Sequence, residues 1–148
     1  MGQSRKILIV EDEEILAENI MTYIQRCGWD GRIAPTGRLA VETADSFRPD
    51  VILLDYHLPD MNGFQILEAI REGCSPEGGC ILMTGHPTDT VLTAALEHGI
   101  RRILYKPFSL KDLNTCLKTL PEEFETPPMG APMGREFQPE RRMRSRSN

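Results

Sequence analysis

The feature of this chain that most restricts its fold is a regular alternation of short β-rich apolar runs with segments of helical periodicity. The apolar runs are KILIV (6–10), GRIAP (31–35), DVILL (50–54), CILM (80–83) and RILY (102–105). Between the first two, apolar residues recur at helical spacing from Ile15 to Ile24, and Gly28 follows as the predicted stop of that helix. Such an alternation predicts parallel strands covered by helices on both faces.

The number of repeated units excludes a closed barrel. Five strand–helix units occupy about 115 residues, too few for a barrel of eight, so the sequence predicts an α/β fold with an open, doubly wound, five-stranded parallel sheet. Thr36 and Thr88 are predicted helix N-caps, and Ser109 with Asp112 has the spacing of a capping box. Sheets of this kind bind ligands at the carboxyl ends of their strands, so functional residues are expected there.

Composition separates the chain into two parts. Residues 1–120 are predicted to form one domain. Residues 121–148 contain five prolines and no apolar period and are predicted to be a disordered tail or linker, Pro-rich at first and Arg-rich at its end. The domain is acidic, with 12 Lys and Arg against 17 Asp and Glu, which disfavours a nucleic-acid surface on the folded part and suits a cation site.

Several classes of protein are excluded by what the sequence lacks. No apolar run approaches the roughly 18 residues that span a bilayer, and acids follow the first apolar run where a signal peptide would continue. The chain is therefore expected to be cytoplasmic, with no membrane partner. The four cysteines have neither zinc nor redox spacing and are expected to be reduced.

Polar residues follow the predicted strands at one edge of the sheet. Glu11 and Asp12 follow the first strand, Asp55 the third, Thr84 the fourth and Lys106 the fifth. Each of them alone fits a cap, a turn or a solvated loop. Together, the carboxylates are costly to gather unless a cation neutralises them, and hard oxygen ligands favour Mg²⁺ or Mn²⁺ over zinc.

The same residues suggest phosphoryl transfer. A hydroxyl and an ammonium opposite a divalent cation would bind phosphoryl oxygens, and Asp55, between the two groups, could attack phosphorus to form an aspartyl phosphate. The strand would then expose Asp55 so that it can be reached from outside. The protein's contribution would be positioning and charge neutralisation.

At these residues the chain resembles the response regulator receiver domain of two-component signalling. The matching pieces are ILIVEDEE, DVILLDYHLPDMNGFQIL, ILMTGH and YKPFSLKDL, and the resemblance covers about residues 5–120. It implies a flavodoxin-like fold with strand order 2-1-3-4-5 and helices on both faces. It also implies a phosphorelay function, in which a histidine kinase or a phosphotransfer protein supplies the phosphoryl group.

The resemblance assigns the metal site and the acceptor. Asp55 would be the phosphoacceptor and a metal ligand, Asp12 would bind Mg²⁺ directly, and Glu11 would hold the ion through water. The backbone carbonyl of His57 would supply another ligand, so the His57 side chain is not required.

The resemblance also assigns the residues of the switch, which are those that respond to phosphorylation. Thr84 would bind the phosphoryl group in the active state and Lys106 would pair with it, while Pro107 matches the family's cis-proline. The family commonly has Tyr or Phe three residues before the lysine, but here that position is Ile103, so an aromatic ring cannot report the switch. Phosphorylation is instead expected to act through residues 85–90 and the helix that follows.

Two alternatives remain open at this stage. One is a magnesium-dependent phosphatase with an aspartyl nucleophile, although such enzymes carry a second Asp where this chain has His57. The other is an unphosphorylated adaptor of the same fold, although all the expected site residues are present. The leading prediction is a signalling phosphoacceptor, not an enzyme, that assists its own phosphorylation and dephosphorylation. Its output partner, a missing output domain and a homodimer are left undecided.

Two further residues are assigned structural roles. His98 stands at a predicted helix C-terminus, where a cation is favourable. Gly63 is expected to serve the turn into the third helix.

Overall fold

Five parallel strands form the sheet that the alternation predicts. They are β1 (Lys6–Val10), β2 (Asp30–Ala34), β3 (Val51–Asp55), β4 (Cys80–Thr84) and β5 (Arg102–Tyr105). Their order in the sheet is β2-β1-β3-β4-β5, so the predicted fold class and strand order are confirmed. The computed structural model describes residues 5–74, 76 and 79–125.

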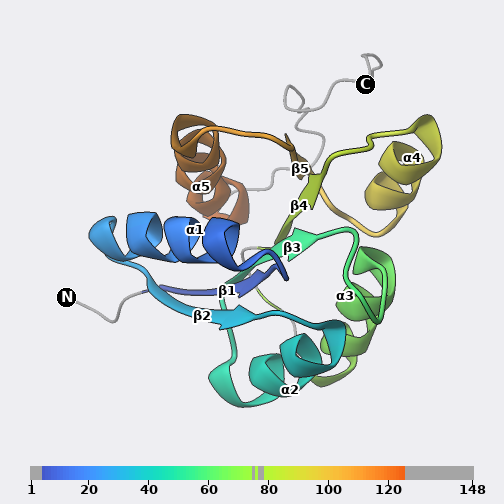
Figure 1. Ribbon diagram of the computed structural model, residues 1–148, viewed down its shortest axis with the longest axis horizontal. Coiled ribbons are helices and arrows are strands. Elements are labelled where there is room, and N and C mark those ends of the chain that lie inside the picture. Colours follow the sequence, from blue (N-terminus) through green and yellow to red (C-terminus); the bar gives the residue numbers. More distant parts are fainter. Residues whose placement is uncertain (1–4, 75, 77–78, 126–148) are drawn as a thin grey trace.

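Helices cover both faces of the sheet (Figure 1). The helices are α1 (Glu14–Arg26), α2 (Gly37–Phe47), α3 (Gly63–Gly73), α4 (Asp89–Glu97) and α5 (Leu110–Glu125). Helices α1 and α5 pack on one face, whereas α2, α3 and α4 pack on the other. Among the described helices, none is long and apolar enough to cross a membrane.

Two apolar cores lie on the two faces of the sheet, and the central strands supply both. All residues of β3 are buried, and successive residues point to opposite faces, so Leu53 joins the α1 and α5 side while Leu54 joins the α2 to α4 side. A strand buried on both faces needs the continuous apolar run that the sequence shows.

The residues predicted to cap the helices do so in the structure. Thr36 and Thr88 each accept a hydrogen bond from the backbone N–H three residues on, at 3.1 and 3.2 Å. Ser109 and Asp112 exchange the two bonds of a capping box, at 3.0 and 3.1 Å. Gly28 lies just beyond α1 with φ of +93°, a conformation that glycine adopts without steric cost.

The C-terminal end of the last helix differs from the predicted domain boundary. Helix α5 continues to Glu125, five residues past Leu120, and Pro121 lies within it. The boundary was predicted from the loss of apolar periodicity, which marks where a helix stops packing, whereas backbone hydrogen bonds can continue for another turn. The rest of the predicted tail, residues 126–148, lies outside the described residues.

Candidate functional site

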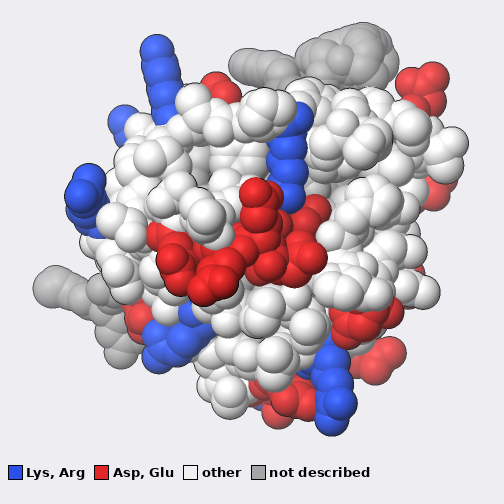
Figure 2. Space-filling view, in the orientation of Figure 1, with Lys and Arg blue, Asp and Glu red and all other residues white. Residues whose placement is uncertain are grey.

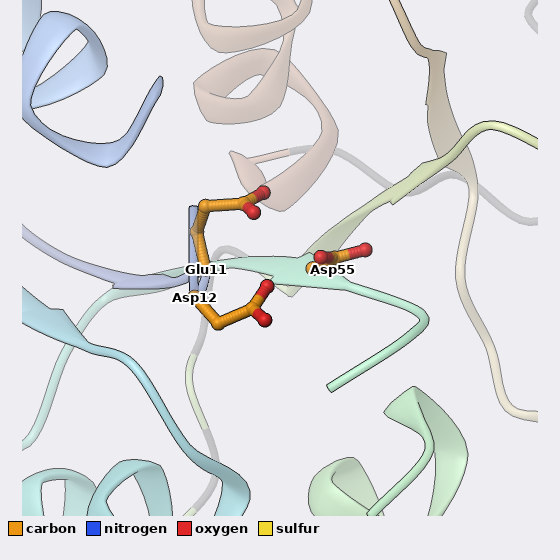
Figure 3. A group of neighbouring side chains, drawn as sticks. All are labelled: Glu11, Asp12 and Asp55. Carbon is orange, nitrogen blue, oxygen red and sulfur yellow. The ribbon is translucent and has the colours of Figure 1, made fainter. Parts of the chain in front are cut away.

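Three carboxylates meet at the carboxyl ends of β1 and β3. Glu11 and Asp12 follow β1, and Asp55 is the last residue of β3. Their side chains point into the same space (Figure 3), and one oxygen of each lies within 4.8 Å of the others. Because β1 and β3 are adjacent and parallel, residues at their ends must lie side by side.

Burial of the three acids is unequal. Glu11 is 1% exposed and Asp55 is 5% exposed, whereas Asp12 lies at the surface. The expectation of an exposed Asp55 is therefore wrong: β3 extends one residue further than predicted, and Asp55 belongs to its buried end. A group that reacts with Asp55 must reach into the site.

Lys106 joins two of the acids. Its Nζ lies 2.8 Å from Glu11 Oε1 and donates a hydrogen bond to Asp55 Oδ2 at 3.2 Å. The contact with Glu11 is an ion pair in which the two groups are not aligned as a hydrogen bond. The peptide bond between Lys106 and Pro107 is cis. Lys106, the residue that follows β5, thus brings its ammonium to the acids at the ends of β1 and β3.

Burial and charge act on this ion pair in opposite directions. Burial raises the pKa of Glu11, the close contact with Lys106 opposes this rise, the charge of Asp55 adds to it, and the pKa lies above its ordinary value. Burial alone would lower the pKa of Lys106, but contacts with Glu11 and Asp55 outweigh it, so that pKa is raised. Lys106 is therefore fully charged at neutral pH.

Backbone N–H groups bind the second carboxylate oxygens of Asp55 and Glu11 and the hydroxyl of Thr84. Asp55 Oδ1 accepts a hydrogen bond from the His57 N–H at 3.2 Å, and Glu11 Oε2 accepts one from the Glu13 N–H at 3.1 Å. Thr84, which is fully buried, accepts one through its hydroxyl from the His86 N–H at 3.1 Å. The hydroxyl predicted to bind a phosphoryl group is thus engaged with the loop that follows β4.

The predicted switch position lies on the α4 side of the sheet. Ile103 is half-buried and packs against the core cluster that contains Val91 and Ala95 of α4. Tyr105, two residues further along β5, is 49% exposed.

One residue that positions the loop beside the site could not be predicted from local patterns. Asp60, in the loop after β3, accepts hydrogen bonds from the N–H groups of Gly37 and Arg38 at 2.8 and 3.0 Å. These bonds lower its pKa and hold the loop against the N-terminus of α2. Since the partners are more than 20 residues apart, only the acidic character of Asp60 offered a signal.

Gly63 has a different role from the predicted one. Its φ is not positive, so no special turn conformation requires glycine. A Cβ at this position would instead lie 3.1 Å from the Cα of Tyr56 and 3.4 Å from the carbonyl oxygen of Asp55. Gly63 is therefore needed for the close approach of α3 to the segment that follows Asp55.

The charge and chemistry of the site fit a divalent cation. Figure 2 shows acidic side chains gathered on one face with a basic side chain against them. Three carboxylates with one ammonium leave two negative charges without a partner in the cluster. All the candidate side-chain ligands are carboxylate oxygens, as Mg²⁺ prefers. The cluster could hold such an ion.

Comparison with known proteins identifies the family. Residues 7–118 match the response regulator receiver domain. The chain belongs to this family. A receiver domain was expected from the motifs, and that expectation is confirmed. Receiver domains act in two-component signal transduction, which makes this chain a signalling domain.

Similar proteins include longer regulators and isolated receivers. The chain is 34% identical over 119 residues to the probable transcriptional regulatory protein TcrX of Mycobacterium tuberculosis, covering 80% of this chain and 50% of TcrX. It is 37% identical over 99 residues to the luminescence regulatory protein LuxO of Vibrio campbellii, covering 67% of this chain and 22% of LuxO. A CheY-like receiver domain protein from Methanospirillum hungatei has a crystal structure with a TM-score of 0.77 at 25% identity, covering 83% of this chain and 98% of that one. The chain thus spans half or less of these two regulators.

Proposed function

We propose that this receiver domain accepts a phosphoryl group on Asp55 in a magnesium-dependent reaction, with a histidine kinase or a phosphotransfer protein as donor. The observation that carries the proposal is the position of the Asp55 carboxylate, which lies beside Glu11 and Asp12 and bonds Lys106 at 3.2 Å. A carboxylate between a cation site and an ammonium is placed to react with a phosphoryl group.

In the proposed transfer, an oxygen of Asp55 attacks phosphorus of a phosphohistidine. The O–P bond forms as the P–N bond breaks, and the electron pair of the P–N bond stays on the departing imidazole. A bound Mg²⁺ would neutralise charge on the phosphoryl oxygens. Asp12, Asp55 and the carbonyl of His57 are the proposed ligands of the ion, and Glu11 would bind it through water. Lys106, already at Asp55, would follow the charge to the new phosphoryl group.

Phosphorylation would be sensed by Thr84 and Lys106. A movement of the Thr84 hydroxyl toward a phosphoryl group would disturb the hydrogen bond that it accepts from the His86 N–H, and would so shift the loop between β4 and α4. Ile103 packs against the core cluster that includes Val91 and Ala95 of α4, and it has no ring to flip, so the change would pass through the backbone of residues 85–90 into α4. The output surface would then lie around residues 88–105.

The domain would act on another protein or on a domain attached to it. TcrX is named a transcriptional regulator and is twice as long as the matched region, so a fused output domain or a separate partner both fit a receiver of this length. The alternative of a phosphatase lacks the second aspartate, because His57 stands in its place. A phosphatase would turn over many substrate molecules, whereas a receiver would hold the phosphoryl group on the acceptor aspartate until its own dephosphorylation.

Intact mass spectrometry tests the proposal directly. The chain is incubated with acetyl phosphate and Mg²⁺, and one added phosphoryl group is expected; chelating the metal should prevent it. Asp55→Asn should gain no mass, while the matched control Asp89→Asn, an exposed aspartate at the start of α4, should behave as the unmodified chain does. A phosphoryl group on the Asp55→Asn protein would reject the assignment.

A further inference from the structure

His98, at the C-terminal end of α4, connects that helix to α3. Its Nδ1 lies 2.8 Å from the carbonyl oxygen of Ala94, one turn earlier in α4. Its Nε2 lies 3.0 Å from Oε2 of Glu68 in α3. Its ring stacks on that of Phe64, also in α3, with centroids 4.6 Å apart and planes 13° from parallel. The capping role expected from the sequence describes only the first of these contacts.

Arg71 holds the backbone at the same place. Its guanidinium donates a hydrogen bond to the carbonyl oxygen of His98 at 2.7 Å. Glu68 and Arg71 are the charged groups of α3 that act on the imidazole, the first attracting a positive charge and the second repelling it. The side chain and the main chain of His98, the residue that caps α4, are thus both bonded to α3.

The two ring nitrogens make this contact sensitive to protonation. Each nitrogen faces an oxygen that can only accept a hydrogen bond, the Ala94 carbonyl and the Glu68 carboxylate. An imidazolium donates to both at once, whereas a neutral imidazole donates from one nitrogen and leaves a lone pair facing the other oxygen. The contact is complete only while His98 is charged.

The environment favours the charged form. The bond to the Ala94 carbonyl raises the pKa of His98, burial lowers it, and the bond and charge of Glu68 raise it again, so that the pKa lies above its ordinary value. The His98 side chain is 23% exposed and that of Glu68 is 66% exposed, so water screens the ion pair but can also deprotonate the ring. A group with a raised pKa in the folded state stabilises that state at low pH and ceases to do so as the pH rises through that pKa.

We propose that His98 is a pH-sensitive latch: as imidazolium it binds the C-terminal end of α4 to α3 through both ring nitrogens, and as neutral imidazole it holds that end less firmly. The contact acts on α4, which begins after the loop that follows Thr84 and shares a core cluster with Ile103. Acidification would therefore hold α4 in the position described here, and a rise in pH would loosen it. The inference goes beyond the proposed phosphoryl transfer and does not depend on it.

Two measurements on the full chain test the latch. In the first, NMR follows the assigned ring signals of His98 through a pH titration. The midpoint is expected above the ordinary value for histidine, and Glu68→Gln should lower it. Glu72→Gln is the matched control, since it removes the same charge from the same helix at a residue without a contact to His98.

The second measurement is backbone hydrogen exchange at the end of α4, corrected for the intrinsic effect of pH. The backbone N–H groups of His98, Gly99 and Ile100 donate to carbonyls of the last turn of α4, so their exchange shows whether that turn is formed. Their protection should fall several-fold as the pH passes the titration midpoint of His98. The fall should move to lower pH in Glu68→Gln and disappear in His98→Phe, which keeps a ring on Phe64 without a titrating group.

Either measurement can overturn the latch. If Glu68→Gln and Glu72→Gln leave the His98 midpoint equally unchanged, Glu68 does not support the charged form. If the midpoint moves as expected while the protection of α4 stays independent of pH, the pair is a surface contact that does not hold the helix.

Discussion

Replacing Lys106 by methionine tests the electrostatics of the site most directly. Methionine keeps much of the apolar stem but removes the ammonium that lies 2.8 Å from Glu11 and 3.2 Å from Asp55. Two carboxylates, 1% and 5% exposed, would then lie together without a cation. Losing one partner of a buried pair costs about 3–5 kcal/mol, and because the Lys106 side chain is 22% exposed we expect about 2 kcal/mol at pH 7. In a domain of this size that is a fall of roughly 8 °C in melting temperature.

The loss of stability caused by Lys106→Met should depend on pH in a defined direction. Without Lys106, the raised pKa of Glu11 rises further, because an opposing contact is lost. An acid whose pKa is raised by folding destabilises the folded state above that pKa, and the penalty disappears as the pH falls through it. The difference in stability between Lys106→Met and the unmodified chain should therefore narrow as the pH is lowered toward the ordinary pKa of a glutamate.

A divalent cation should compensate for the missing ammonium. A ligand that binds only the folded state at ten times its dissociation constant adds about 1.4 kcal/mol, and Mg²⁺ should add more to Lys106→Met than to the unmodified chain. Urea unfolding with Mg²⁺ and with a chelator measures both effects, and Lys111→Met, at an exposed lysine of α5, is the control. Equal stability of the two methionine variants without metal would refute the reasoning.

Three further predictions follow from the site, the close approach of α3 and the tail. Asp12→Ala should weaken Mg²⁺ binding roughly tenfold with little loss of stability, since Asp12 is exposed, and unchanged affinity in a calorimetric titration would place the metal elsewhere. Gly63→Ala should cost about 1–2 kcal/mol in urea unfolding because its Cβ would lie 3.1 Å from the Cα of Tyr56, whereas Gly73→Ala, with more room, should not; equal costs would contradict this. Removing residues 126–148, whose composition predicts no packing, should leave the melting temperature nearly unchanged, and a large fall would show that they contact the domain.

The sequence by itself determined the architecture and the composition of the site. Helix and strand periodicity, N-caps such as Thr36 and Thr88, and the glycine after α1 are local signals, and they predicted every element with strand ends within one residue. The place of Glu11, Asp55 and Lys106 at one edge followed from the alternation alone, because parallel strands end at the same side of a sheet.

Only the tertiary structure decided how those residues are buried and what they contact. The recessed position of Asp55, the bonds of Asp60 to the start of α2 and the contact of His98 with Glu68 depend on how distant segments pack. Periodicity states which face of an element is apolar, but not which side chain of another element will lie opposite a given atom. Strand register and helix packing decide this. They fix the distances at which hydrogen bonds form, and so they determine which side chains are charged, which are accessible and which interact.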